Sequence, residues 1–327
     1  MRKFVRVSFF FLVTIVLCVG ITINITLAQE DRFPSKPISL IIGTAPGSST
    51  EVPARALAKA AEKILGQPIV CSNTPGAAGA RALGQVLKAK PDGYTLVCVP
   101  SSGQITSIVE KLDYALPDDS TPIIQYQSVP IPFAVRKDAH WKTWQEFVKY
   151  AREHKGIVTV GVFGSKGLNW LLLRQIEERD RIKFVYAPYS GGGEAATAIL
   201  GGHLTASTVV SSIVYAKSGE LRLLLVFSDQ RLKSFPDVPT AKELYGPRGV
   251  DLVGGFVGIF GPKGLPKSIL MRLHDAFRKG MEDEEYIKVT ESFDLVISYR
   301  PPEEFANSLK RTDEVTREFL RREDGRQ

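Results

Sequence analysis

The sequence has few of the residues, and none of the short motifs, that mark the common catalytic and metal-binding classes. Among 327 residues there are only 3 Cys and 4 His. The histidines lie far apart, at positions 140, 154, 203 and 274, and none has a cysteine or carboxylate at metal-ligand spacing, so we expect no metal and no cofactor. The patterns G-x-S-x-G, G-x-x-x-x-G-K-[ST], G-x-G-x-x-G and H-E-x-x-H do not occur, which argues against an enzyme.

Cysteine is also too scarce to form a disulfide framework. Beyond the first 30 residues only Cys71 and Cys98 occur, and both lie in apolar, strand-like runs. We therefore expect two buried thiols, although an exported protein permits a disulfide.

The N-terminus has the pattern of an export signal. Arg2, Lys3 and Arg6 precede an apolar run over residues 7–25, and the small residue Ala28 ends the segment before polar residues begin. This predicts a signal peptide at residues 1–28, cleaved after Ala28. The apolar run is also about as long as the ~18 residues that mark a spanning helix, so an uncleaved tether is the alternative.

Positive charge is in mild excess and scattered. Cleavage of 28 of the 327 residues leaves 299 and lowers the formal net charge from +7 to +4, because three cations and no acid are removed. A scattered excess argues against a nucleic-acid face and is compatible with attraction of a small anion.

From residue 37 onward, short apolar runs alternate with helical stretches, which predicts parallel sheets with helices on both faces. The first series has expected strands at 38–42, 69–71 and 94–99 and helices at 50–65 and 79–89. Residues 112–132 hold four prolines and little periodicity, so they are expected to form a connection.

A second series follows. Its expected strands are 131–136, 157–162, 183–186, 205–210 and 221–227, with helices at 143–153, 168–179 and 193–200. A strand at 256–260 and helices at 267–279 and 303–321 end the chain. We interpret this order as two lobes, lobe 1 at 32–131 plus 255–327 and lobe 2 at 132–254, each a mostly parallel sheet with flanking helices. Ligands of such sheets bind outside the carboxyl ends of the strands, so the facing lobes would share a cleft.

Three loops that follow strands and open helices are the candidate binding segments. Each is rich in small residues, which let a ligand approach the free N–H groups at a helix start, where an anion is favoured. The loops are GTAPGSSTE at 43–51, GVFGSKGLNW at 161–170 and APYSGGGE at 187–194.

Each loop also has a plainer interpretation. In the first, Ser49 or Thr50 would cap its own helix and Glu51 would be favoured in the first turn. In the second, Lys166 could bring a positive charge to a carboxylate or simply be solvated, as most lysines are. In the third, Tyr189 could line the cleft or pack against it.

The sequence resembles the extracytoplasmic solute receptors of tripartite tricarboxylate transporters, the Bug family, from residue 33 to about residue 319. The stretches that match, in the family's order and spacing, are FPSKPISLIIGTAPGSSTE, LGQPIVCSNTPGAAGA, KPDGYTL, APYSGGGEA, ILGGH, FPDVPTAKEL and GIFGPKGLP. The resemblance implies a type II periplasmic-binding-protein-like α/β fold whose two lobes close on a carboxylated metabolite. It also implies a periplasmic monomer that catalyses nothing and whose partners are membrane permease subunits.

The resemblance further implies a set of ligand contacts, made mostly through backbone groups, hydroxyls and ordered water. Carried over position by position, they are Ala45, Gly47, Ser48, Ser49, Ser101, Ser102, Gln104, Gly164, Ser165, Lys166, Gly167, Tyr189, Gly191 and Gly192.

The chain departs from the family at several of these loops. The family usually has glycines where Ser48 and Ser49 stand, an Asp at Glu51, and a small residue followed by Ser-His at 168–170. An Asp common after the Gly-Gly pair of the second lobe is missing from residues 203–206. These changes imply a different ligand, smaller or flatter than usual. A sensory receptor for a membrane kinase remains an alternative, and an exported enzyme acting on an organic acid is a weaker one.

Overall fold

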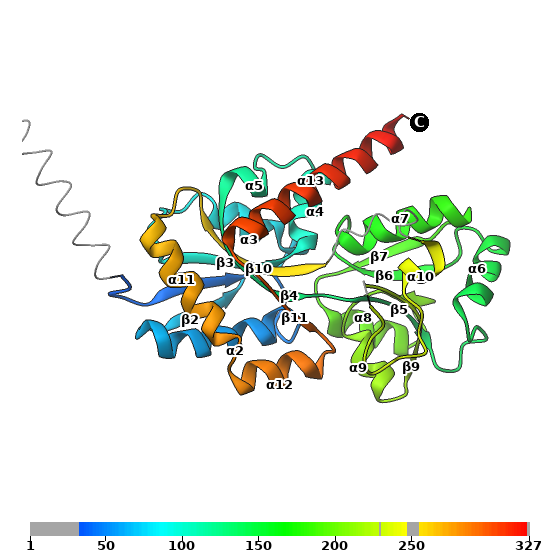
Figure 1. Ribbon diagram of the computed structural model, residues 1–327. Helices are drawn as coiled ribbons and strands as arrows, with labels where there is room; N and C mark the ends of the chain where they lie inside the picture. The colour runs from blue at the N-terminus through cyan, green and yellow to red at the C-terminus, as the bar shows by residue number, and fades with distance from the viewer. Residues whose placement is uncertain (1–32, 229, 247–254, 326–327) are drawn as a thin grey trace, which may run out of the picture.

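The protein consists of two α/β lobes that lie side by side (Figure 1). The computed structural model describes residues 33–228, 230–246 and 255–325. The predicted two-lobed architecture is confirmed. The signal peptide and its cleavage site lie outside the described residues.

Lobe 1 contains a six-stranded sheet in the order β11-β4-β10-β3-β1-β2. Its strands are β1 (Ile38–Ile42), β2 (Ile69–Asn73), β3 (Thr95–Pro100), β4 (Ser120–Ser128), β10 (Phe256–Pro262) and β11 (Val296–Arg300). Its helices are α2 (Glu51–Leu65), α3 (Ala80–Val86), α4 (Ser101–Val109), α5 (Leu116–Asp119), α11 (Lys267–Gly280), α12 (Glu284–Ser292) and α13 (Pro302–Asp324), with a short 3₁₀ turn at Ala77–Gly79.

Lobe 2 contains a five-stranded sheet in the order β7-β6-β8-β5-β9. Its strands are β5 (Ile131–Arg136), β6 (Thr159–Phe163), β7 (Val185–Tyr189), β8 (Ala206–Ser207) and β9 (Leu221–Phe227). Its helices are α6 (Trp144–Glu153), α7 (Leu168–Asp180), α8 (Gly192–Leu200), α9 (Ser212–Lys217) and α10 (Ala241–Tyr245). The helix α13 leaves lobe 1 and ends beside α7 (Figure 1), where Trp170 packs edge-on against Phe319.

Both sheets are mixed, whereas mostly parallel sheets were predicted. In lobe 1, β1 pairs in parallel with β2 and β3, but β10 runs antiparallel to both β3 and β4. In lobe 2, β6 pairs in parallel with β7 and β8, while β5 is antiparallel to β8 and β9. The antiparallel pairs arise from the connection between the lobes. The chain leaves lobe 1 along β4 and returns along the neighbouring β10, so these two strands run in opposite directions.

The prediction that residues 112–132 form a connection is wrong. This stretch contains α5 and the strand β4, which includes the fully buried Ile123, Ile124 and Tyr126. Two of its prolines occupy places that tolerate them: Pro117 lies in the first turn of α5, and Pro122 faces Phe260 where the pairing register shifts. The helices α4 and α12 and the edge strand β11 were not predicted either.

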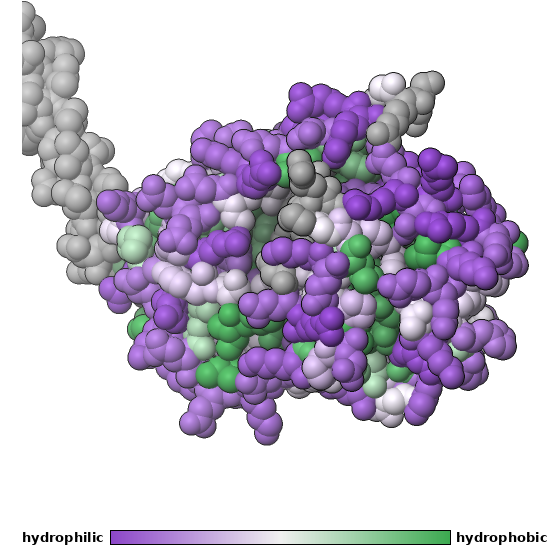
Figure 2. All heavy atoms as spheres, turned by 45° about the vertical axis from the view of Figure 1, so that its right-hand side comes forward, coloured by the Kyte–Doolittle hydropathy of each residue, from purple (hydrophilic) through white to green (hydrophobic). Residues whose placement is uncertain are grey.

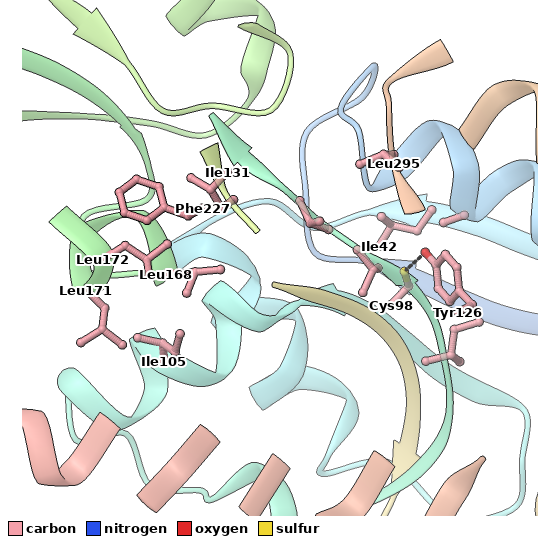
Figure 3. Close-up of a cluster of buried hydrophobic side chains, with 14 of the residues drawn as sticks. Ile42, Cys98, Ile105, Tyr126, Ile131, Leu168, Leu171, Leu172, Phe227 and Leu295 are labelled. Atoms are coloured by element: carbon pink, nitrogen blue, oxygen red, sulfur yellow. Dashed lines mark hydrogen bonds between the residues drawn. The ribbon is translucent and has the colours of Figure 1, made fainter. Parts of the chain in front are cut away.

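The apolar core is continuous between the lobes. One buried cluster runs from Ile42, Cys98 and Tyr126 in lobe 1 to Leu168 and Leu172 on α7 (Figure 3). Hydrophilic side chains cover most of the face in Figure 2, and apolar ones are scattered in small groups. Within the described ranges, no helix combines the length and apolar character needed to cross a membrane.

Cys71 and Cys98 are free thiols, but the prediction that both are buried holds only for Cys98, because Cys71 is partly buried. Cys98 is buried, and its sulfur lies 3.1 Å from the Tyr126 hydroxyl. Burial raises the pKa of Cys98 to about 12 and that of the partly buried Cys71 to about 11.

Because the thiolate is the reactive form, both cysteines are expected to react slowly with a thiol-specific disulfide reagent at pH 8. Labelling should become complete within minutes once guanidinium unfolds the protein, which the absorbance of the released chromophore reports. Labelling of Cys98 in the native protein at the unfolded rate would contradict this burial.

Candidate ligand-binding site

Four helices begin at the cleft between the lobes, α2 and α4 from lobe 1 and α7 and α8 from lobe 2. A narrow cavity of about 50 Å³ lies among them. This is small beside the roughly 300–1,000 Å³ of typical ligand pockets, so the guest is small or the lobes open to admit it. The lining residues are Thr44, Ser48, Ser49, Thr50, Pro100, Ser101, Ser102, Val129, Ile131, Phe163, Leu168, Asn169, Gly192, Val209, Val210, Ser211 and Phe256.

The helix starts can bind an anion. Pro100, Gly167 and Gly191 stand at the N-cap positions of α4, α7 and α8, and none of the three offers a side-chain cap to its own helix. The partial positive charge of these helix starts is therefore not offset by a local cap, although the Leu168 N–H of α7 donates to the Ser102 hydroxyl. Among the described residues that line the cavity, none has a charged side chain.

The loop before α2 is organised by Ser48. Its hydroxyl accepts the Glu51 N–H at 3.1 Å and lies 2.8 Å from the Thr44 hydroxyl. The prediction that Ser49 or Thr50 caps α2 is therefore wrong: the loop turns so that Ser48, one or two residues earlier, reaches the first helical N–H. Ser48 and Ser49 line the cavity, whereas Ala45 and the exposed Gly47 do not.

The two serines that open α4 line the cavity from lobe 1. The Ser101 hydroxyl accepts the Phe256 N–H at 3.4 Å, and the Ser102 hydroxyl accepts the Leu168 N–H of lobe 2 at 3.3 Å. Gln104 lies elsewhere. Its buried amide donates to the Leu309 carbonyl of α13 at 2.8 Å, one turn beyond the cavity.

The loop before α7 forms the seam between the lobes. A Cβ placed at Gly164 would lie 2.6 Å from Ala78 Cβ, and one at Gly167 would lie 2.9 Å from Ser102 Cβ. The Ser165 hydroxyl donates to Glu110 of lobe 1 at 3.4 Å. These residues thus hold lobe against lobe and do not line the inner cavity.

A second, more open cavity of about 380 Å³ lies outside the first. Gly164, Ser165 and Tyr189 line it from lobe 2, and Phe163 lines both cavities. Gly191 lines neither cavity; it is buried at the seam, where a Cβ placed on it would be 3.1 Å from Ala45 Cβ of lobe 1.

Four polar lining residues were not among the predicted contacts. Thr44, Thr50 and Asn169 lie within the candidate loops 43–51 and 161–170, whereas Ser211 lies outside all three loops. The Asn169 amide donates to the Thr208 carbonyl at 2.7 Å, which fixes its orientation in the first turn of α7. The Ser211 hydroxyl is buried and has no hydrogen-bond partner within the described structure. Sequence carried no clear signal for Ser211, because the short strand β8 was predicted to continue to residue 210.

Lys166 does not line either cavity. Its side chain is exposed, and its backbone carbonyl accepts the Thr106 hydroxyl at 3.3 Å. We expect Lys166→Ala to change ligand affinity by less than about threefold, because an exposed charge outside the cavity is screened by solvent. Calorimetric titration measures this, and a loss of tenfold or more would place the ammonium group on the ligand.

The fold defines a two-lobed solute-binding protein, with a cavity lined by helix starts between its lobes.

Comparisons with known proteins identify the family. The model of the tripartite tricarboxylate transporter family receptor, TctC, matches residues 53–318. A UPF0065 protein from Cupriavidus necator, encoded in the gbd 5' region, is 34% identical over 287 residues, which cover 87% of this chain and 86% of the relative. The chain belongs to the TctC receptor family.

Solved structures agree with this assignment. One described as a periplasmic transporter has a TM-score of 0.83 and 27% identity, covering 89% of this chain and 98% of its own. MatC from Rhodopseudomonas palustris, solved with bound malate, has a TM-score of 0.80 and 25% identity, covering 88% of this chain and 100% of its own.

Proposed function

We propose that this chain is a periplasmic receptor that captures a small carboxylate and delivers it to the membrane subunits of a tripartite tricarboxylate transporter. It is exported by a signal peptide cleaved after Ala28, and it acts as a monomer that binds without catalysis and without a cofactor. Lobe 1 (32–131 and 255–327) and lobe 2 (132–254) move as two bodies about the crossing segments.

The observation that carries this proposal is the cavity lined from both lobes by hydroxyls at helix starts. Hydroxyl and N–H donors at a helix N-terminus stabilise an anion without a cation. Because the donors come from opposite lobes, a guest favours the closed arrangement in proportion to its contacts with both. MatC, which has the same fold, holds malate.

Of the residues that the resemblance implied, we propose Ser48, Ser49, Ser101, Ser102 and Gly192 as direct contacts, since these line the cavity. The other polar groups there, above all Ser211 and Asn169, join them. The seam between the lobes has a different role: its residues contact lobe 1 and stabilise the closed form without touching the ligand. These residues are Gly164, Ser165 and Gly167.

Charged pairs outside the cavity would hold the closed form. Asp294 of lobe 1 accepts from Lys217 and Ser234 of lobe 2, each at 2.8 Å. On the other side of the cleft, Arg174 of α7 pairs with Glu323 of α13. Such partly exposed pairs each contribute at most about 1 kcal/mol, so ligand binding can decide between open and closed forms.

Calorimetric titration of ligand-stripped, refolded protein with mono-, di- and tricarboxylates tests the proposal. Heat and a thermal shift with at least one acid, and neither with its uncharged amide, are expected. No response to any carboxylate would refute the receptor function.

A further inference from the structure

We infer that the guest is a compact monocarboxylate with an apolar body, a short aliphatic acid, and not a dicarboxylate. This rests on the proposed carboxylate-receptor function and narrows its ligand class. Three features of the cavity carry the inference: where donors are free, where they are already used, and what forms the rest of the wall.

Free donors gather at the starts of α4 and α8. The hydroxyls of Ser101 and Ser102 each accept a backbone N–H, so each has its own hydrogen left to donate, and neither has an acceptor for it within the described residues. From lobe 2, the buried Ser211 hydroxyl has no partner in the described chain, and it lies against Gly192 at the uncapped start of α8. Three hydroxyls and a helix start suit one carboxylate.

The start of α2 is already occupied by a carboxylate of the chain itself. Glu51 is 5% exposed, and its side chain accepts the Gly47 N–H at 3.0 Å and pairs with Arg55. The Glu51 N–H goes to Ser48, and the Val52 N–H goes to the Ser48 carbonyl at 3.1 Å. The helical N–H groups at this end are therefore used, and a second guest carboxylate would find only the hydroxyls of Ser49 and Thr50 beside the resident charge of Glu51.

Apart from Asn169, whose amide N–H already donates to the Thr208 carbonyl, the remaining wall is apolar. Val129 and Ile131 lie on the segment that crosses from β4 to β5, and Phe256 begins the strand that returns to lobe 1. Phe163, Leu168, Val209 and Val210 complete this wall from lobe 2. An ionised group buried against such side chains without donors is strongly disfavoured, whereas methyl and methylene groups gain from the contact.

The ranking of matched acids tests this inference. With the mature full-length chain, butyrate and 3-methylbutyrate should bind at least about tenfold more tightly than succinate, malate and adipate, and more tightly than acetate, which lacks the apolar body. Dicarboxylates that bind as tightly as the monocarboxylates, or more so, would overturn the monocarboxylate assignment and leave the receptor function intact. Failure of every acid to bind would refute both the monocarboxylate assignment and the receptor function.

A pair of variants tests the role of Glu51. In Glu51→Gln the resident charge is gone, so succinate affinity should rise by about fivefold while butyrate affinity stays within about twofold. Arg55→Gln is the matched control: it breaks the same ion pair but leaves the carboxylate at the start of α2, so succinate affinity should not rise. A rise in both variants, or in neither, would refute the resident-carboxylate argument, and urea denaturation of each variant confirms that it is folded.

Discussion

Gly164→Ala is expected to weaken ligand binding by roughly tenfold to a hundredfold, because the added methyl group would wedge the lobes apart. The new Cβ would lie 2.6 Å from Ala78 Cβ and 3.3 Å from the Ala78 backbone across the seam. Overpacking of this kind typically costs about 1–3 kcal/mol, and the cost is imposed only on the closed form. Small-angle scattering should show that the radius of gyration no longer decreases when ligand is added.

Gly164 also has a positive φ of 69°, so alanine there brings backbone strain as well as a clash. Gly156→Ala separates the two effects, since Gly156 has a φ of 75° and an added methyl group there would meet nothing within 4 Å. Both variants should lose about 1 kcal/mol of unfolding free energy, but only Gly164→Ala should lose affinity. Equal affinity losses would show that the seam does not control closure.

Gly192→Ala should abolish most ligand binding and lower the unfolding free energy by about 1–3 kcal/mol. Its Cβ would lie 2.3 Å from the Ser211 hydroxyl and 2.8 Å from Ser211 Cβ. Rotation of the hydroxyl relieves only the first contact, so the backbone must also shift, and one proposed donor is lost. Loss of a hydrogen bond to a charged group weakens binding by about 1.5–3 kcal/mol, or more than tenfold. Calorimetric titration with the tightest-binding acid gives this number directly.

The neighbouring Gly193 provides the control. It lies in the same helical turn, and an alanine there would meet nothing within 4 Å. Gly193→Ala should retain native affinity and gain up to about 1 kcal/mol of stability from the better helix former. If Gly193→Ala lost as much affinity as Gly192→Ala, the position of Ser211 would not explain the effect.

Sequence patterns predicted the alternation of strands and helices well wherever a short apolar run marked a strand or apolar residues recurred at helical spacing. They failed over residues 112–132, because Pro122 is tolerated at a bulge of β4 and Pro117 at the start of α5, and only the finished sheet supplies these places. They also failed on strand direction, which is set by the chain's crossing and return and not by local residue preference.

The lining of the cavity could be anticipated only in part. Small residues at helix starts pointed to the loops that hold Ser48 and Gly192, and the family resemblance pointed to Ser101; all three residues line the cavity. The sequence could not show that Gln104 turns toward α13, or that Ser211 comes within reach of Gly192, because both depend on packing between elements distant in the chain.

A crystal structure of the mature protein with the tightest-binding carboxylate tests the central claim most directly. The account predicts one carboxylate within about 3.2 Å of donors from both lobes, Ser101 or Ser102 on one side and Ser211 or the Gly192 N–H on the other. A ligand held by a single lobe, or seated only in the outer cavity beside Tyr189, would contradict it.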